Sequence, residues 1–166
     1  SDFENQIKES KVYYYQSEYK TAYDNYIAYQ KIAGDTSEKA MKMLSNAIEH
    51  ADNASIITPN DYSSIKLSGL AANYKKETEK ASKKFEMLTT IKPDTVDSWF
   101  QLGRLYFNSK DYNKAIVYNK KAFELDNSYV PAIELLAFSY EGLKDTANAI
   151  QAYKDALNIE PNNISY

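Results

Sequence analysis

The chain has 166 residues, a formal net charge of −3, no cysteine and one histidine. The lack of cysteine excludes disulfides and thiolate metal sites. A lone histidine is insufficient for a metal site or a nucleophile–base pair, because both need several converging groups. We therefore expect His50 to serve structure or to face solvent. Lysines and acidic residues are interspersed throughout, so no basic face suited to nucleic acid is expected.

No apolar run approaches the roughly 20 residues that a membrane-spanning helix needs, so we expect a soluble chain without direct membrane insertion. The chain begins at Ser1 rather than at a methionine. That start is consistent with prior removal of a leader or lipid anchor, and the sequence assigns no compartment. Few glycines and prolines, together with apolar residues at three- and four-residue spacing, predict an all-α fold.

Residues 3–36 are predicted to form a degenerate helix pair that is rich in tyrosine. Gln6 and Glu9 stand where large apolar residues are expected, so this end is predicted to be frayed or to act as a polar cap. Most of the tyrosines are expected to pack between helices. Tyr15 and Tyr23 are the better candidates for a surface that binds carbohydrate or peptide.

Residues 37–61 break the period of the chain and are predicted to form an irregular helical insertion. A helix is expected from Glu38 to Asp52, and Pro59 followed by Asn60-Asp61 predicts a helix end and a new start. Residues 62–95 carry a weak copy of the repeating pattern that is clearest in the last part of the chain. No helix-breaking residue occurs in Lys75-Lys76-Glu77, so one long helix and two shorter helices both remain open.

Residues 96–129 and 130–163 carry the pattern most clearly. The segment from Trp99 to Tyr106 has the spacing W-x2-L-G-x2-Y. One repeat later, apolar or small residues occupy the equivalent positions, namely Ile133, Leu136, Ala137, Tyr140, Ala149 and Ala156. Asp111 and Asp145 are expected to cap the second helix of each pair, and Pro131 suits a first helical turn.

This pattern resembles the tetratricopeptide repeat family. The resemblance implies one domain over residues 1–166, a right-handed superhelical array of antiparallel helix pairs in which the first helix of each pair lines a concave groove. It implies that the groove-facing residues are Lys66, Leu70, Asn73, Phe100, Arg104, Phe107, Asn108, Glu134, Phe138 and Glu141. The alternative that Phe100 and Phe107 merely pack between repeats stays open.

The same resemblance implies a scaffold or adaptor that binds a peptide or helical segment of another protein. A lysine–asparagine–arginine clamp for a terminal carboxylate is not expected, because only the first of its positions fits among Lys66, Leu70, Gln101, Pro131 and Leu135. No catalytic signature occurs, so we expect no enzyme, cofactor or metal site. The alternative is a structural module, part of a longer repeat protein or self-associating through its C-terminal repeat.

Overall fold

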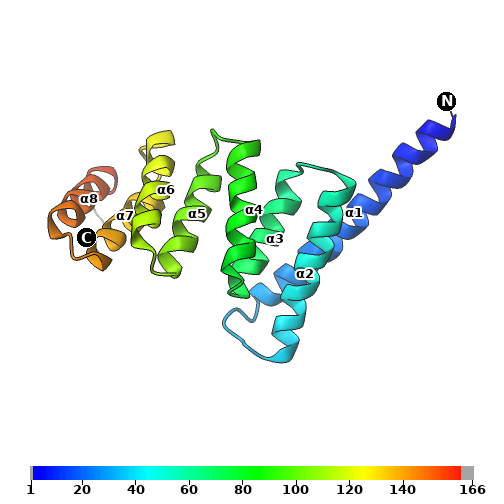
Figure 1. Ribbon diagram of the computed structural model, residues 1–166, viewed down its shortest axis with the longest axis horizontal. Helices are drawn as coiled ribbons and strands as arrows, with labels where there is room; N and C mark the ends of the chain where they lie inside the picture. The colour runs from blue at the N-terminus through cyan, green and yellow to red at the C-terminus, as the bar shows by residue number, and fades with distance from the viewer. Residues whose placement is uncertain (1, 162–166) are drawn as a thin grey trace. The chain divides into compact units, whose positions relative to one another are not determined.

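The computed structural model describes residues 2–161 (Figure 1). Within that range the chain folds into eight α-helices and contains no β-strand, which confirms the predicted all-α fold. The chain divides into two compact units, Ser1–Ile91 and Lys92–Tyr166, which we call unit 1 and unit 2.

Unit 1 contains two helix pairs. They consist of α1 (Asp2–Gln30) with α2 (Glu38–Ile57), and α3 (Tyr62–Tyr74) with α4 (Thr78–Ile91). Each helix packs against the next one along the chain, and α1 also contacts α3. Neighbouring pairs therefore share a core, as expected for helix pairs that are too small to bury their own apolar faces.

The first helix pair differs from the layout that the sequence predicted. Residues 3–36 do not form two helices, because α1 runs without a break from Asp2 to Gln30. Gly34 is the first glycine or proline in the chain, so nothing earlier in the sequence interrupts the helix. The segment predicted as an insertion supplies the partner of α1, since α2 packs along it.

Unit 2 repeats this arrangement with α5 (Val96–Asn108), α6 (Tyr112–Leu125), α7 (Val130–Gly142) and α8 (Thr146–Ile159). Consecutive helices pack together, and α5 also contacts α7. The core between the last three helices consists of Ile133, Leu136, Ala137, Ala152 and Ala156. Pro131 occupies the first turn of α7, as predicted.

A lysine occupies the same place in the turns of three successive helix pairs, with one repeat length between each lysine and the next. Lys76, Lys110 and Lys144 have φ values of 62°, 63° and 60°, in the left-handed region. In the second of these turns the amide of Asp111 donates to the carbonyl of Tyr106 at 2.9 Å, a helix-ending bond that the other two turns also form. The turn at Lys76 shows that residues 62–91 make two helices, so the period extends into unit 1.

The aspartates that follow two of these turns act as helix caps. Asp111 Oδ1 accepts from the amide of Lys114, and Asp145 Oδ1 accepts from the amide of Asn148, each at 3.2 Å. Both predicted caps are therefore confirmed. Such a bond satisfies one of the amides that a first helical turn leaves unpaired.

Gly103 is a point of closest approach between α5 and α6. A Cβ atom added there would lie 2.5 Å from Nδ2 of the fully buried Asn119, and closer still to its Cγ and Oδ1. Gly69 has the same relation to Phe85 between α3 and α4, with a Cε1 atom at 2.7 Å. Gly103 and Gly69 thus each stand where two helices of a pair come closest together.

Candidate protein-binding surface

Seven of the predicted groove residues lie on two neighbouring helices of unit 2. We call this set the α5–α7 strip; it consists of Phe100, Arg104, Phe107 and Asn108 on α5 and Glu134, Phe138 and Glu141 on α7. They share a face because spacings of three, four and seven positions bring side chains onto one side of a helix. The contact between α5 and α7 places the two sets of side chains next to each other.

Phe100 is mainly a packing residue. Its side chain is buried in a cluster with Ala122 and Ala132. The ring of Tyr129 meets it edge-on, with 5.2 Å between centroids. The packing role that the sequence left open for Phe100 is therefore what the structure shows.

Arg104 is held in place by a short polar chain along α5. Its Nη2 donates to Gln101 Oε1 at 2.7 Å, and Gln101 Nε2 donates to Asp97 Oδ1 at 3.0 Å. The guanidinium carbon lies 5.9 Å from the centroid of the Phe100 ring, within range of a cation–π contact. Arg104 remains partly exposed, so its positive charge is available at a fixed position.

Phe138 is the exposed aromatic residue of the strip, with 42% of its surface accessible. Its ring lies 6.3 Å from that of Phe107 and 6.2 Å from that of Tyr153 on α8. Phe107 in turn packs against Tyr112 at 5.9 Å. Two neighbouring rings thus restrain the orientation of Phe138 and leave one side of it open.

Glu134 and Glu141 give the α7 part of the strip a negative charge. Burial, a hydrogen bond to Glu141 and the charges of Glu141 and Glu134 raise the pKa of the Tyr153 hydroxyl to about 12. Glu134 and Glu141 stand four positions before and three positions after Phe138 on α7, so both lie on the same side of the helix as Phe138. Asn108 lies exposed at the end of α5.

Comparison with known proteins identifies the repeats of unit 2. Tetratricopeptide repeat sequences match residues 96–129 and 130–163. Residues 96–163 belong to the tetratricopeptide repeat family. Arrays of these repeats are protein-interaction scaffolds and are typically not catalytic.

Solved structures of MamA have the same fold as this chain. "Crystal structure of MamA" is 20% identical, with a TM-score of 0.68, and the match covers 85% of this chain and 90% of that one. "Crystal structure of MamA protein" is 19% identical, with a TM-score of 0.68 and 96% of each chain covered. No curated protein sequence matches this chain. At such identities the likeness concerns the fold, and it supports a helical repeat array over most of the chain.

Two tyrosines that were not predicted as groove residues also contact the α5–α7 strip. Tyr129 and Tyr153 both contact it, one from the loop before α7 and the other from α8. Helix periodicity does not apply to a loop residue, so no sequence signal pointed to Tyr129. Tyr153 is the equivalent of Asn119 one repeat later. Asn119 on α6 faces α5, and Tyr153 on α8 likewise faces α7.

The other three predicted groove residues, Lys66, Leu70 and Asn73, lie half-buried on α3 of unit 1. The tyrosines of α1 form a row in the same unit, where the rings of Tyr15, Tyr19 and Tyr23 stack with centroid distances of 6.0 and 6.3 Å. The Tyr15 hydroxyl donates to Asp61 Oδ2 at 3.1 Å. Tyr15 thus ties α1 to the start of α3, whereas Tyr23 is exposed.

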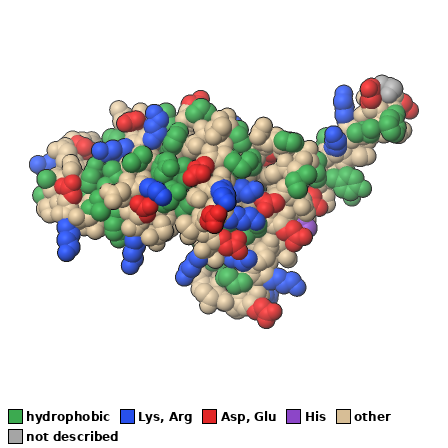
Figure 2. Space-filling model, viewed as in Figure 1, with side chains coloured by type: hydrophobic (Ala, Val, Ile, Leu, Met, Phe, Trp, Pro, Cys, Tyr) green, Lys and Arg blue, Asp and Glu red, His purple; other side chains and the backbone are tan. Residues whose placement is uncertain are grey.

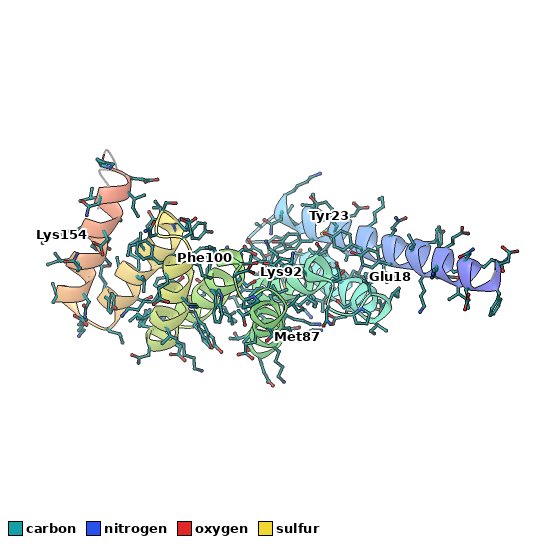
Figure 3. The ribbon with its side chains drawn as sticks, turned by 90° about the horizontal axis from the view of Figure 1, so that it is seen from above. Glu18, Tyr23, Met87, Lys92, Phe100 and Lys154 are labelled. Carbon is teal, nitrogen blue, oxygen red and sulfur yellow. The ribbon has the colours of Figure 1, made fainter. Side chains whose placement is uncertain are left out.

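Two polar clusters in unit 1 join helices to one another. His50 Nδ1 lies 2.7 Å from Glu18 Oε2, and Asn53 donates to the same oxygen at 3.1 Å. Figure 3 shows Glu18 on the side of α1 that faces α2, with Tyr23 on another side. The hydrogen bond from His50 is the main cause that lowers the pKa of Glu18. His50 therefore has the structural role that was expected for it.

The second cluster surrounds Asp52 on α2. Its Oδ1 atom accepts from Ser68 Oγ and Lys84 Nζ, each at 2.7 Å, and its Oδ2 atom lies 3.0 Å from Lys80 Nζ. Burial alone would raise the pKa of Asp52, but the hydrogen bonds from Lys84, Ser68 and Lys80 outweigh it and lower the pKa. Asp52 thus links α2 to both α3 and α4.

Neither cluster is suited to metal binding. Among residues 2–161, no three histidine or acidic side chains converge in a way that could hold a metal ion. Within the same part of the chain, no helix is both long and apolar enough to cross a membrane.

Proposed function

We propose that the α5–α7 strip binds an extended or helical segment of another protein. Phe138 carries this proposal, because it is an exposed aromatic side chain whose ring is restrained by Phe107 and Tyr153. A restrained aromatic side chain loses little conformational freedom on binding, and such residues often contribute most of the energy of an interface.

The charges around Phe138 favour a segment of particular chemistry. Glu134 and Glu141 lie on α7, about one helical turn on either side of Phe138, whereas Arg104 lies on α5 and donates to Gln101. A segment that places an apolar side chain on Phe138 and a lysine or arginine toward the two glutamates would match both features. Arg104 would then donate a hydrogen bond to a carbonyl or carboxylate oxygen of the same segment.

The proposal can be tested with a library of displayed random peptides selected on the wild-type chain. Enriched peptides should carry an apolar residue flanked by basic residues, and Phe138→Ala should weaken their binding by about tenfold or more. Arg104→Glu should weaken binding as well. Ile150→Ala on α8 is a matched control, because Ile150 is exposed to a similar extent but lies outside the strip.

Two results would contradict the proposal. One is the absence of any enriched peptide. The other is equal binding by the wild type and Phe138→Ala when both variants unfold at the same urea concentration. Loss of binding in Ile150→Ala alone would move the binding surface to α8.

One observation favours a second role as a structural module. Ile116 on α6 packs against the core that contains Ile133 and Leu136 of α7. Ile150 occupies the equivalent position of α8, and 49% of its surface is exposed. We infer that α8 can be covered by a helix of a further repeat. If a second copy supplies that helix, light scattering at high concentration should show larger assemblies for the wild type than for Ile150→Asp. Assemblies of equal size in the two proteins would argue against this role.

A further inference from the structure

The first half of α1 extends past the end of α2. Figure 1 shows this part of α1 projecting from the rest of unit 1, and every residue from Asp2 to Tyr14 is exposed. The last turn of α2 reaches only as far as Lys11 and Tyr14, which line a shallow hollow together with Ile56 and Ile57. Isolated helices shorter than about 12–15 residues have marginal stability in water, so this segment gains much from a partner.

The exposed half of α1 continues the face that packs against α2. Further along the helix this face contains Glu18, which contacts His50, and Ala22, which packs with Ala51. Toward the N-terminus the same face continues, at three- and four-residue spacing, through Tyr14, Ser10, Ile7 and Phe3. A solvated helix face is normally polar, whereas this one is largely apolar where nothing in unit 1 covers it.

The exposed fractions show how much apolar surface the face presents. They are 70% for Phe3, 41% for Ile7 and 60% for Tyr14, and Ile56 at the end of α2 is 76% exposed. Figure 2 shows hydrophobic side chains on the projecting segment as well as charged ones. Residues 3, 7, 10 and 14 follow the alternating four- and three-residue spacing of a helix–helix seam, with Ser10 as its small member.

The charges beside this seam complement those of a second copy. Glu4 and Lys11 lie on the same side of the seam, two helical turns apart. Consider an antiparallel pair in which Phe3 of one copy lies opposite Tyr14 of the other. Glu4 of one copy and Lys11 of the other are then offset by only about 3 Å along the helix axis. The two-fold axis forms every such contact twice. A parallel pair would instead place Lys11 beside Gln6, without any opposite charge.

We propose that the first half of α1 pairs with the same segment of a second copy of this chain, in an antiparallel arrangement. Phe3 of each copy then covers Tyr14 of the other and approaches Ile56, so that each copy completes the seam that α2 leaves uncovered. Four large apolar side chains per copy suggest an interface of about 1,000 Å², at the lower end for specific association. The dimer should therefore dissociate on dilution.

The test is sedimentation equilibrium on the full chain over a concentration series. The wild type should show a monomer–dimer equilibrium. In a dimer of either Glu4→Lys or Lys11→Glu, residues 4 and 11 of opposite copies carry like charges at both ends of the seam. Each substitution alone should therefore weaken association by about tenfold or more. An equimolar mixture of the E4K and K11E chains has opposite charges at both places, so it should associate as strongly as the wild type.

Further variants separate this proposal from loss of folding and from the α8 surface. Ile7→Asp should give a monomer, and circular dichroism should show that most of the helical signal is retained, because residues 2–14 lie outside the core of unit 1. Ile150→Asp should still show this monomer–dimer step. A wild-type monomer at every concentration, or a mixture of E4K and K11E chains that associates no better than either alone, would overturn the proposal. Association lost only in Ile150→Asp would overturn it as well.

Discussion

Replacing Gly103 with alanine should destabilise unit 2, although alanine is the better helix former. The new methyl group would overlap Asn119, which is fully buried and donates to the carbonyl of Ala115 at 2.9 Å. Overpacking typically costs about 1–3 kcal/mol and loss of the hydrogen bond about 1 kcal/mol, while the higher helix propensity of alanine returns about 1 kcal/mol. The free energy of unfolding should therefore fall by about 1–3 kcal/mol.

Trp99 makes this measurement specific to unit 2. It is the single tryptophan of the chain, and its ring stacks on Tyr118 at 6.3 Å between centroids. Its fluorescence during urea unfolding reports the stability of unit 2 directly. In an Asn119→Ala background the obstacle is gone, so Gly103→Ala should be neutral or stabilising. An equal loss of stability in both backgrounds, or no loss in either, would refute the proposed overlap between α5 and α6.

Three other predictions concern single side chains. Lys110→Gly should raise the free energy of unfolding by about 0.5–1 kcal/mol in the same assay, because glycine adopts the left-handed φ of 63° without strain, whereas Lys110→Val should lower it. Asp52→Asn should lower the free energy of unfolding by about 1–3 kcal/mol at neutral pH. The pKa of Asp52 is lower in the folded state, so its stabilising contribution is present above the unfolded pKa of about 4 and is lost as the pH falls through the folded value. The unfolding free energies of wild type and Asp52→Asn should therefore converge in acid. A difference that stays constant with pH would contradict the role of the charge. Tyr153 should ionise near pH 12, as seen in the ultraviolet absorbance difference between wild type and Tyr153→Phe, and Glu141→Gln should bring its pKa back toward 10. The raised pKa means that the contribution of Tyr153 to stability is complete below about pH 10 and is lost as the pH rises through about 12.

The helix pairs of unit 2 were predictable because their signals are local. Asp111 and Asp145 cap helices through amides three positions away, and Pro131 fits the first turn of its own helix. None of these roles depends on residues far away along the chain, so spacing alone was sufficient to predict them.

The first pair was predicted wrongly because its local signals are weak. Nothing between Asp2 and Gln30 ends a helix, yet the repeat pattern suggested two helices there. The pairing of α1 with α2 depends on contacts between residues that are far apart along the chain, such as Glu18 with His50. A fixed period does not reveal a pair whose two helices differ in length from those of the other repeats.

The strip on α5 and α7 shows the same division. The resemblance to tetratricopeptide repeats placed Phe100, Arg104 and Phe138 on the groove-facing side of their helices, and as binding residues they remain a prediction. It could not tell that Phe100 is buried against Tyr129 while Phe138 is 42% exposed, since both are phenylalanines on that face.

The sequence by itself determined that the chain is helical, that the helices of residues 96–163 come in pairs, and where those pairs are capped. Such features follow from hydrogen bonds and apolar spacing within about one helical turn. Only the tertiary structure decided which faces stay uncovered, from Phe138 on α7 to Phe3 and Ile7 on α1. The exposure of a side chain depends on the neighbours that other helices bring to it, and those neighbours are set by packing over the whole unit.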